Sequence, residues 1–470
     1  AQKDTGQSLS DLLETIPNVT DHLFRNAPKA AMTIYSQMMP GDGVRPEFTT
    51  WRDEQWAWRN TIAVHDQSYH MNSTHVRGPD ALAFTQYLSV NSFKTFEVGA
   101  AKQLVCCSPE GYLIGDAILY RMGEDDYMVV GNPATTEWVE YNAEVLDFDV
   151  TTESDPMWTL NKAKRREFYR FQVEGPKAWE LLEELNGGPL PEIKFFKSAV
   201  IKLGDYTARG MRHSMGGMPG LEISGPWDDY RAVKKLLMTA GEKYGLRLVG
   251  SRAYASAAAE SGWVPSVVPA IYTGEKMKTY RQWLKATSFE ALSTLGGSMK
   301  TGNIEDYYMT PWDVDYGRVI KFDHDFIGRA ALEKMAEQPQ RKKMTLVWDA
   351  DDVLKVNAGY MDDGDLPTKN MDFPAAHYAS YPYDLVTKDG RTVGISIAPA
   401  YSANERAWIS LAVLDPDVAE TGTEVTVTWG EPDGGSSKPT VERHRQIDVK
   451  TEVHPWPIHD AVREAYRKQT

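Results

Sequence analysis

Three short segments of the sequence carry side chains that could move protons or hold a polar ring. They supply, in chain order, Gln67, His70, Glu222, Arg252 and Tyr254. A phenol, whose reference pKa is about 10, and an imidazole can give or take a proton at a reacting oxygen. A carboxylate and a guanidinium can hold the polar edge of a ligand through paired hydrogen bonds. Taken singly, each residue is explained equally well by core packing or a surface ion pair.

The spacing of three histidines invites comparison with a metal site. His65, His70 and His75 recur every five residues. On a strand, successive members of this set point to opposite faces, and on a helix they lie about 140° apart. The cluster Asp323-His324-Asp325 is explained equally well as a polar loop before a helix. We therefore predict that the protein holds no metal ion.

The composition is that of a globular protein with an acidic surface. Its 470 residues carry a formal net charge of −15, which argues against a nucleic-acid-binding face. The two cysteines, Cys106 and Cys107, are adjacent, which is typical of a reducing compartment and not of a disulfide framework or a zinc ribbon. We find no apolar run of membrane-spanning length and no apolar leader within Ala1–Ser10. We expect a cytoplasmic protein, and the sequence gives no expectation for its oligomeric state.

Motifs of three large enzyme classes are missing. The segment Gly296-Gly-Ser-Met-Lys-Thr has a Lys-Thr pair but not the spacing of a phosphate-binding loop. No Gly-x-Gly-x-x-Gly follows a strand, and no Gly-x-Ser-x-Gly elbow is present. The sequence therefore argues against a P-loop nucleotidase, a Rossmann dehydrogenase and an α/β-hydrolase.

The pattern of apolar residues predicts an α+β body. Segments 74–82, 169–179 and 220–230 each indicate a short strand, a Gly-Pro step and an amphipathic helix. Units of this kind build layers of helices on sheets. Another helix is predicted over Thr50–Asn60, with a capping threonine at its start.

The last part of the chain has a different pattern. From about Arg341 onward, β-rich runs alternate with Gly-containing turns, and a short helix, Ala330–Met335, leads into them. The runs lie at 344–348, 392–397, 408–413 and 424–429. We therefore predict an all-β domain over residues 336–470.

Several segments, in a common order, resemble the glycine-cleavage T-protein superfamily of folate-dependent methyl- and aminomethyltransferases. They are Asp66-Gln-Ser-Tyr-His-Met, Val76-Arg-Gly-Pro-Asp-Ala-Leu, Gly220-Leu-Glu-Ile, Gly250-Ser-Arg and Asp325-Phe-Ile-Gly-Arg-Ala-Ala-Leu. Within that superfamily the chain resembles the tetrahydrofolate-dependent aryl O-demethylases of the vanillate and syringate type. The matching segments include Trp51-Arg-Asp-Glu-Gln-Trp, Gly250-Ser-Arg-Ala-Tyr, Glu260-Ser-Gly-Trp and Asn303-Ile-Glu-Asp-Tyr-Tyr.

This resemblance implies a three-lobed T-protein-like fold around a central channel. Residues 1–335 would form two α+β lobes that are intertwined in sequence, and residues 336–470 a C-terminal β-barrel-like domain. The implied activity transfers a methyl group from a methoxylated aromatic compound to tetrahydrofolate, giving 5-methyltetrahydrofolate and a phenol or catechol. Two alternatives stay open, namely a folate-dependent demethylase of a small sulfonium or amine and a folate-binding protein without catalysis.

Matching motif positions imply roles for individual residues. The folate-binding positions correspond to Glu222, Arg252, Asp116 and Trp263; the catalytic ones to Tyr254 and His70; and the substrate-binding ones to Gln67, His70, Asn132 and Tyr35.

At two places the chain departs from the family pattern. Where the family carries two acidic residues, this chain has Gly115 before Asp116. Where the vanillate enzymes carry an arginine for the substrate carboxylate, this chain has Asn132, which supplies no charge. We therefore expect that the substrate need not carry a carboxylate. Arg45, in the lengthened segment Ser36–Arg45, is an alternative partner for one.

Overall fold

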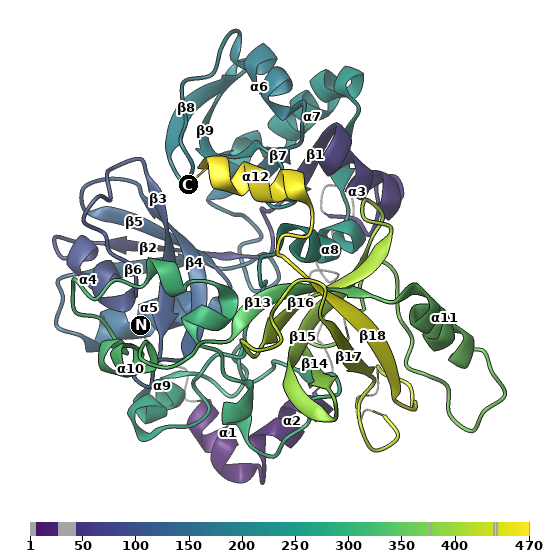
Figure 1. Ribbon diagram of the computed structural model, residues 1–470. Coiled ribbons are helices and arrows are strands. Elements are labelled where there is room, and N and C mark those ends of the chain that lie inside the picture. The colour runs from purple at the N-terminus through teal and green to yellow at the C-terminus, as the bar shows by residue number, and fades with distance from the viewer. Residues whose placement is uncertain (1–5, 27–43, 377, 436–437, 439, 470) are drawn as a thin grey trace.

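The computed structural model describes residues 6–26, 44–376, 378–435, 438 and 440–469. Three β-sheets organise these residues, and they meet around helix α8 (Ser251–Ser261) (Figure 1). The three-lobed α+β architecture implied by the resemblance is therefore confirmed. Within the described ranges, we find no helix with the length and apolar character needed to cross a membrane.

One sheet has six strands and is assembled from two separate stretches of the chain. Its order is β11 (Leu246–Val249), β1 (Ile62–Asp66), β7 (Phe168–Glu174), β10 (Gly220–Pro226), β9 (Tyr206–Arg212) and β8 (Ser198–Leu203). Strand β1 pairs in parallel with β11 and antiparallel with β7, and all of its residues are buried. The helices α6 (Ala178–Asn186) and α7 (Tyr230–Gly241) bury apolar side chains in the core of this lobe.

The second sheet is formed by the chain between β1 and β7. Its antiparallel strands run in the order β3 (Ala101–Cys107), β4 (Leu113–Arg121), β5 (Asp126–Gly131), β2 (Asn72–Arg77) and β6 (Thr151–Asp155). Helices α4 (Ala81–Leu88) and α5 (Pro133–Val145) pack against it. Because this sheet is inserted into the first one, the two lobes are intertwined as expected.

The third sheet closes into a barrel. Its strands are β13 (Lys342–Trp348), β14 (Tyr381–Lys388), β15 (Arg391–Ser402), β16 (Ala407–Leu414), β17 (Glu424–Trp429) and β18 (Ile447–His454). Pairing of β14 with β17 closes the barrel, and β12 (Leu295–Gly296) extends it beside β14. The predicted C-terminal barrel is thus confirmed, while the boundary at residues 335–336 stays a prediction.

The C-terminal region is not purely β, which corrects the sequence-based expectation. It also contains α11 (Ala350–Gly359) and α12 (Asp460–Gln469) (Figure 1). Asp349 caps α11 by accepting a hydrogen bond from the Asp352 N–H, and Val353 and Val356 bury one face of the helix. A local cap and an apolar face therefore make a helix between two β-rich runs.

All three predicted strand–helix units are present. They are β2 with α4, β7 with α6, and β10 with α7. In the first two, the Gly of the Gly-Pro step has a positive φ and touches backbone: a Cβ at Gly78 would lie 2.2 Å from the Asp149 carbonyl oxygen, and one at Gly175 would lie 2.3 Å from that of Thr61. Only glycine fits such a close approach.

The remaining helices complete the body. They are α1 (Leu9–Thr15), α2 (Val19–Arg25), α3 (Trp51–Asn60), α9 (Lys278–Trp283) and α10 (Arg329–Met335). The predicted helix over 50–60 is α3, and its cap is Thr50, whose hydroxyl accepts from the Asp53 N–H at 3.2 Å. Helix α3 packs on β1, β11 and α8, so it supports the region where the lobes meet.

Candidate active site

Tyr254 and His70 come together through their polar atoms. The Tyr254 Oη lies 3.0 Å from the His70 Nε2. Tyr254 belongs to the first turn of α8, and His70 lies in the turn between β1 and β2. The start of α8 approaches a neighbouring loop so closely that a Cβ at Gly250 would lie 2.3 Å from the Pro46 carbonyl oxygen. Two residues predicted from separate motifs therefore face each other.

Both groups are uncharged near neutral pH. Burial, together with the positive charges of Arg170 and Arg166, lowers the pKa of His70 to about 3. Burial raises the pKa of Tyr254 above its usual value, while a hydrogen bond from Gln67 acts in the opposite direction. The contact therefore joins two neutral groups, and the tautomer of His70 decides which of them is the donor.

The Glu222 carboxylate on β10 is half satisfied. Its Oε1 accepts from Arg170, with Nη2 at 2.8 Å and Nε at 3.2 Å, and from the Tyr120 hydroxyl at 2.5 Å. Burial opposes its charge, but the Arg170 guanidinium, His213 and the Tyr120 hydroxyl together outweigh burial and lower the pKa of Glu222. The Glu222 Oε2 is buried and has no hydrogen-bond partner among the described residues. The site therefore presents a charged acceptor that lacks a donor.

A folate ring fits this acceptor. An unpaired buried polar atom costs about 1–3 kcal/mol, so a ligand that supplies an N–H group there gains more than it would at a satisfied site. The pterin edge carries adjacent N–H donors, and a carboxylate accepts such donors in a fixed orientation. The geometry of Glu222 thus agrees with its predicted role as a folate ligand.

Asp116 and Trp263 share a second cluster, which is joined by Tyr316. The Tyr316 hydroxyl donates to Asp116 Oδ2 at 2.8 Å, and Trp263 Nε1 donates to Tyr316 Oη at 3.3 Å. Gln103 Nε2 donates to the same Asp116 oxygen. Burial raises the pKa of Asp116, although these hydrogen bonds act in the opposite direction. Trp263 remains 39% exposed, so part of its ring is free to pack against a ligand.

The departure at Gly115 has a steric basis. A Cβ at this position would lie 2.5 Å from the Thr135 hydroxyl oxygen, which itself donates to the Asp116 carbonyl at 3.2 Å. A side chain at position 115 would therefore require the Thr135 hydroxyl to move. The role of Asp116 in folate binding stays a prediction.

Arg252 belongs to a different group of contacts from Glu222. Its Nη1 donates to Glu47 at 3.3 Å, and its Nη2 donates to the Phe373 carbonyl oxygen. These bonds tie the first turn of α8 to the loop before α3 and to a loop of the C-terminal region. A role in folate binding stays a prediction for Arg252, and its visible contacts are those of an ion pair between segments.

Asn132 is the N-cap of α5. Its Oδ1 accepts from the Thr135 N–H at 3.2 Å, and Pro133 occupies the first helical position. Its place in substrate binding stays a prediction. Tyr35 lies outside the described residues. Arg45 is exposed, and its carbonyl oxygen accepts from the Ser251 N–H at 2.8 Å, next to the start of α8.

The three histidines considered as metal ligands face different partners. His65 Nε2 lies 2.8 Å from Glu174, and His70 contacts Tyr254 as described above. His75 bridges two carboxylates, Asp126 at 2.9 Å and Glu167 at 3.0 Å. His65 lies on β1, His70 in the turn after it and His75 on β2, so each serves a different set of contacts.

Sequence reasoning missed Arg170, Tyr120 and Tyr316. Arg170 lies on β7 beside β10, and the segment Tyr169-Arg-Phe-Gln-Val was noticed only as a strand. A charged residue inside an otherwise apolar strand was a usable signal for Arg170, because buried arginines need a partner. Tyr120 and Tyr316 reach the site from other lobes, and no local pattern marks them.

Comparisons with known proteins agree with this geometry. The GCVT N-terminal domain family matches residues 26–266. A syringate O-demethylase of Sphingobium sp. is 44% identical over 98% of both chains. A sesamin methylene transferase of Sinomonas sp. is 30% identical over 80% of this chain and 83% of that protein.

The fold has a counterpart among solved structures. The glycine cleavage system aminomethyltransferase T of Bartonella henselae superposes with a TM-score of 0.60 and 16% identity, covering 94% of this chain and 96% of that one. This likeness concerns the fold. Taken with the family match over about half of the chain and with a 44% identical relative of equal extent, it leads to one conclusion: the chain belongs to the glycine-cleavage T-protein (GCVT) family.

Proposed function

We propose that the protein is a tetrahydrofolate-dependent O-demethylase of methoxylated aromatic compounds. Its similarity over nearly the full chain to a syringate O-demethylase supports the reaction, and the unpaired Glu222 Oε2 beside the Tyr254–His70 pair supports the site. The products are a phenol or catechol and 5-methyltetrahydrofolate. The single observation that carries the assignment is a half-satisfied buried carboxylate, Glu222, close enough for its charge to act on both Tyr254 and His70.

The residues of the site divide the chemical work. An aryl ether resists cleavage because phenoxide is a poor leaving group, so the departing oxygen needs a proton. Tyr254 donates that proton from Oη, and His70 in its Nε2–H tautomer would donate to the same Oη and leave the tyrosine proton free for the departing oxygen. Glu222, supported by Arg170, holds the folate ring so that its N5 nitrogen can accept the methyl group in line.

The protons balance within this scheme. The methyl–oxygen bond breaks and a methyl–nitrogen bond forms, while Tyr254 gives its proton to the oxygen. The proton that leaves the acceptor nitrogen replaces the one lost by Tyr254.

A methyl-transfer assay tests the function. The protein is incubated with tetrahydrofolate and a panel of methoxyphenols and methoxybenzoates, and 5-methyltetrahydrofolate and the free phenol are quantified together. We expect both products in equal amounts, and activity that resists a chelator. Full demethylation without tetrahydrofolate, or no product from any methoxyarene while a sulfonium or methylamine is demethylated, would overturn the proposal.

The cellular setting follows from the same proposal. Both cysteines are buried and free, which suits a reducing compartment such as the cytoplasm. We place the enzyme there, with a small methoxyaromatic molecule as its partner and no nucleic acid or membrane. Cell fractionation with a tagged chain tests this location.

A further inference from the structure

A buried histidine–carboxylate pair lies directly behind Tyr254. His65 on β1 and Glu174 on β7 are both fully buried, and His65 Nε2 lies 2.8 Å from Glu174 Oε1. The two strands are neighbours, with His65 opposite Gln172. A charge taken fully out of water persists only with a partner and hydrogen bonds, so this pair is held in one arrangement.

The carboxylate of the pair is anchored by the loop before β10. Glu174 Oε2 accepts from the Ser214 hydroxyl at 2.8 Å and from the Met215 N–H at 3.0 Å, and Glu174 Oε1 accepts from the Gly216 N–H at 2.7 Å. Burial opposes the charge of Glu174, but the adjacent His65 ring and the hydrogen bonds from Ser214 and Gly216 together outweigh it and lower the pKa of Glu174. The acceptor that orients His65 is therefore itself fixed.

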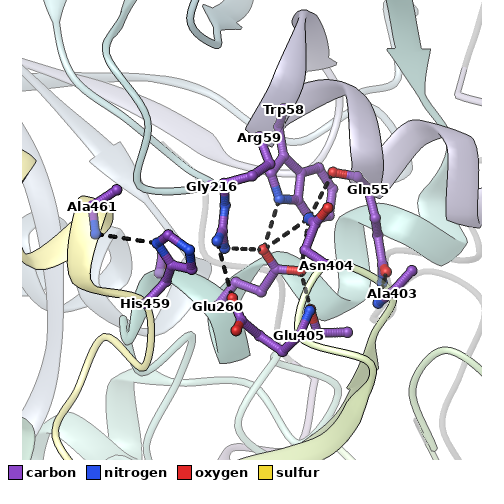
Figure 2. Close-up of polar contacts among 12 residues, drawn as sticks. Gln55, Trp58, Arg59, Gly216, Glu260, Ala403, Asn404, Glu405, His459 and Ala461 are labelled. Carbon is purple, nitrogen blue, oxygen red and sulfur yellow. Dashed lines mark hydrogen bonds and ion pairs between the residues drawn. The ribbon is translucent and has the colours of Figure 1, made fainter.

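Trp58 packs against the His65 imidazole. The rings of Trp58 and His65 stack with centroids 5.7 Å apart. The orientation of the Trp58 indole is fixed, because its Nε1 donates to Glu260 at 3.0 Å in the hydrogen-bonded network of Figure 2. Gly216 also approaches the Trp58 ring, where a Cβ would lie 3.1 Å from it.

Tyr254 packs against the His65 imidazole. Its ring meets His65 edge to face, with centroids 5.6 Å apart, and meets His70 in the same manner at 5.1 Å. We infer that His65, held by Glu174, is a positioning residue that fixes the Tyr254 ring. In that position the Tyr254 Oη lies against His70 Nε2, and its proton can reach the leaving oxygen. This inference rests on the proposed function and names residues that the family motifs did not mark.

The expected effect falls on the chemical step. A misplacement of about 1 Å in a reacting group can cost on the order of 10²-fold in rate. His65→Phe keeps a ring beside Tyr254 but removes the link to Glu174, and Glu174→Gln keeps the shape of the acceptor while removing its charge. We expect kcat to fall about tenfold or more in each, while the affinities for folate and for the aromatic substrate change by less than threefold.

A double-mutant cycle separates positioning from general damage. If His65 acts through the Tyr254 hydroxyl, His65→Phe should slow the wild type about tenfold but slow Tyr254→Phe less than twofold. The loss in His65→Phe should also be larger for guaiacol than for 5-nitroguaiacol, in which the nitro group lies para to the departing oxygen and reduces its need for a proton. His75→Phe is the matched control, because His75 is a buried histidine that lies on another sheet and also has carboxylate partners. The activity of the His75→Phe variant should stay within twofold of wild type.

A spectroscopic measurement keeps the inference independent of turnover. The ¹³Cζ resonance of Tyr254, assigned by its loss in Tyr254→Phe, should be shifted or broadened in His65→Phe and Glu174→Gln but not in His75→Phe. An unchanged resonance, or an equal slowing by His65→Phe in both backgrounds, overturns the positioning role. Absence of methyl transfer in the wild type with a perturbed resonance in the variants would instead reject the proposed function. Should His65→Phe not fold, Glu174→Gln decides by the same readouts.

Discussion

Two buried glutamates at the meeting point of the lobes have opposite hydrogen-bonding states. Glu260 on α8 has donors on both oxygens: Ser402 Oγ at 2.6 Å on Oε1, and Arg59 Nη2 at 2.7 Å and Trp58 Nε1 at 3.0 Å on Oε2. Asn404 donates to both (Figure 2). Glu222 has donors on Oε1 only, and its Oε2 has no partner among the described residues.

This is the difference that we expect between a residue that holds the fold and one that binds a ligand. A fully paired carboxylate has nothing left to offer a ligand, and Glu260 joins α3, α8 and the turn between β15 and β16. A half-paired carboxylate has one oxygen that can still accept a hydrogen bond from a ligand. Without the ligand, the buried unpaired oxygen lowers the stability of the protein. Both residues lie in segments that resemble family motifs, so only the contacts tell their roles apart.

The largest expected effect lies at the other end of α8 from Glu260. Tyr254→Phe keeps the ring contacts with His65 and His70 but removes the donor. Losing a proton donor to the leaving group typically costs on the order of 10²-fold or more in kcat. Folate affinity and thermal stability should stay near wild type. Single-turnover rates measure the effect, and a wild-type chemical rate would reduce Tyr254 to a packing residue.

Next in size is the effect of Glu222→Gln on folate affinity. The Gln carbonyl can still accept from Arg170 and Tyr120, so its amide NH₂ would replace the unpaired Oε2. A donor then meets the N–H edge of the pterin, and we expect the Kd for tetrahydrofolate to rise roughly tenfold to a hundredfold, as for loss of a charged hydrogen bond. Calorimetry measures it.

Arg252→Ala, measured alongside, tests the remaining predicted folate contact; unchanged affinity there would assign Arg252 to its bonds with Glu47 and Phe373 alone.

Glu260→Gln should behave in the reverse way. Whichever Glu260 oxygen the new NH₂ group replaces, it would meet groups that donate to that oxygen now. Arg59 would lose its ion pair with position 260 and keep the one with Glu405. We expect the free energy of unfolding to fall by about 2–3 kcal/mol, as for a broken buried charge network. Folate affinity, measured well below the unfolding temperature, should change less than threefold. Urea denaturation compares the two glutamine variants directly, and equal stability of both would remove the distinction.

The pH dependence of stability probes the neutral partner of the site. The pKa of His70 is about 3 in the folded protein against a usual 6.5. Below about pH 6.5 the unfolded chain binds a proton that the folded chain does not, so the free energy of unfolding should fall as the pH drops toward 3. His70→Gln should show a shallower decline than wild type between pH 7 and 5 in urea titrations. Parallel curves for the two proteins would contradict the neutral state of His70.

Local signals in the sequence predicted local structure and part of the site. Gly-Pro steps and apolar periodicity were enough for the strand–helix units, and motif positions led to Tyr254, His70 and Glu222. The roles of Asn132 and Asp349 as helix caps were also readable, since Asn before Pro and Asp before a helical pattern are common starts.

The rest depends on how the lobes pack. Tyr120 reaches Glu222 from the five-stranded sheet, and Tyr316 reaches Asp116 from a segment 200 residues away. Such contacts arise from the docking of separately folded layers, and no spacing within a single segment encodes them. The same holds for Glu174, whose partners lie on β1 and in the loop before β10.

The smallest expected effect concerns substrate choice at Asn132. Its Oδ1 caps α5, so Asn132→Arg removes a cap worth about 1 kcal/mol while adding a charge. If the ring substituent para to the hydroxyl, which in vanillate is the carboxylate, approaches this position, an arginine can pair with it. Hydrogen bonds to charged groups are worth about 1.5–3 kcal/mol against roughly 1 for neutral ones. We expect the ratio of kcat/KM for vanillate over guaiacol to rise roughly three- to tenfold. Asn132→Ala is the control, because it loses the same cap without gaining charge and should leave the ratio unchanged. Equal ratios in the arginine and alanine variants would mean that Asn132 serves α5 alone, which would place it with Glu260 among the residues that hold the fold.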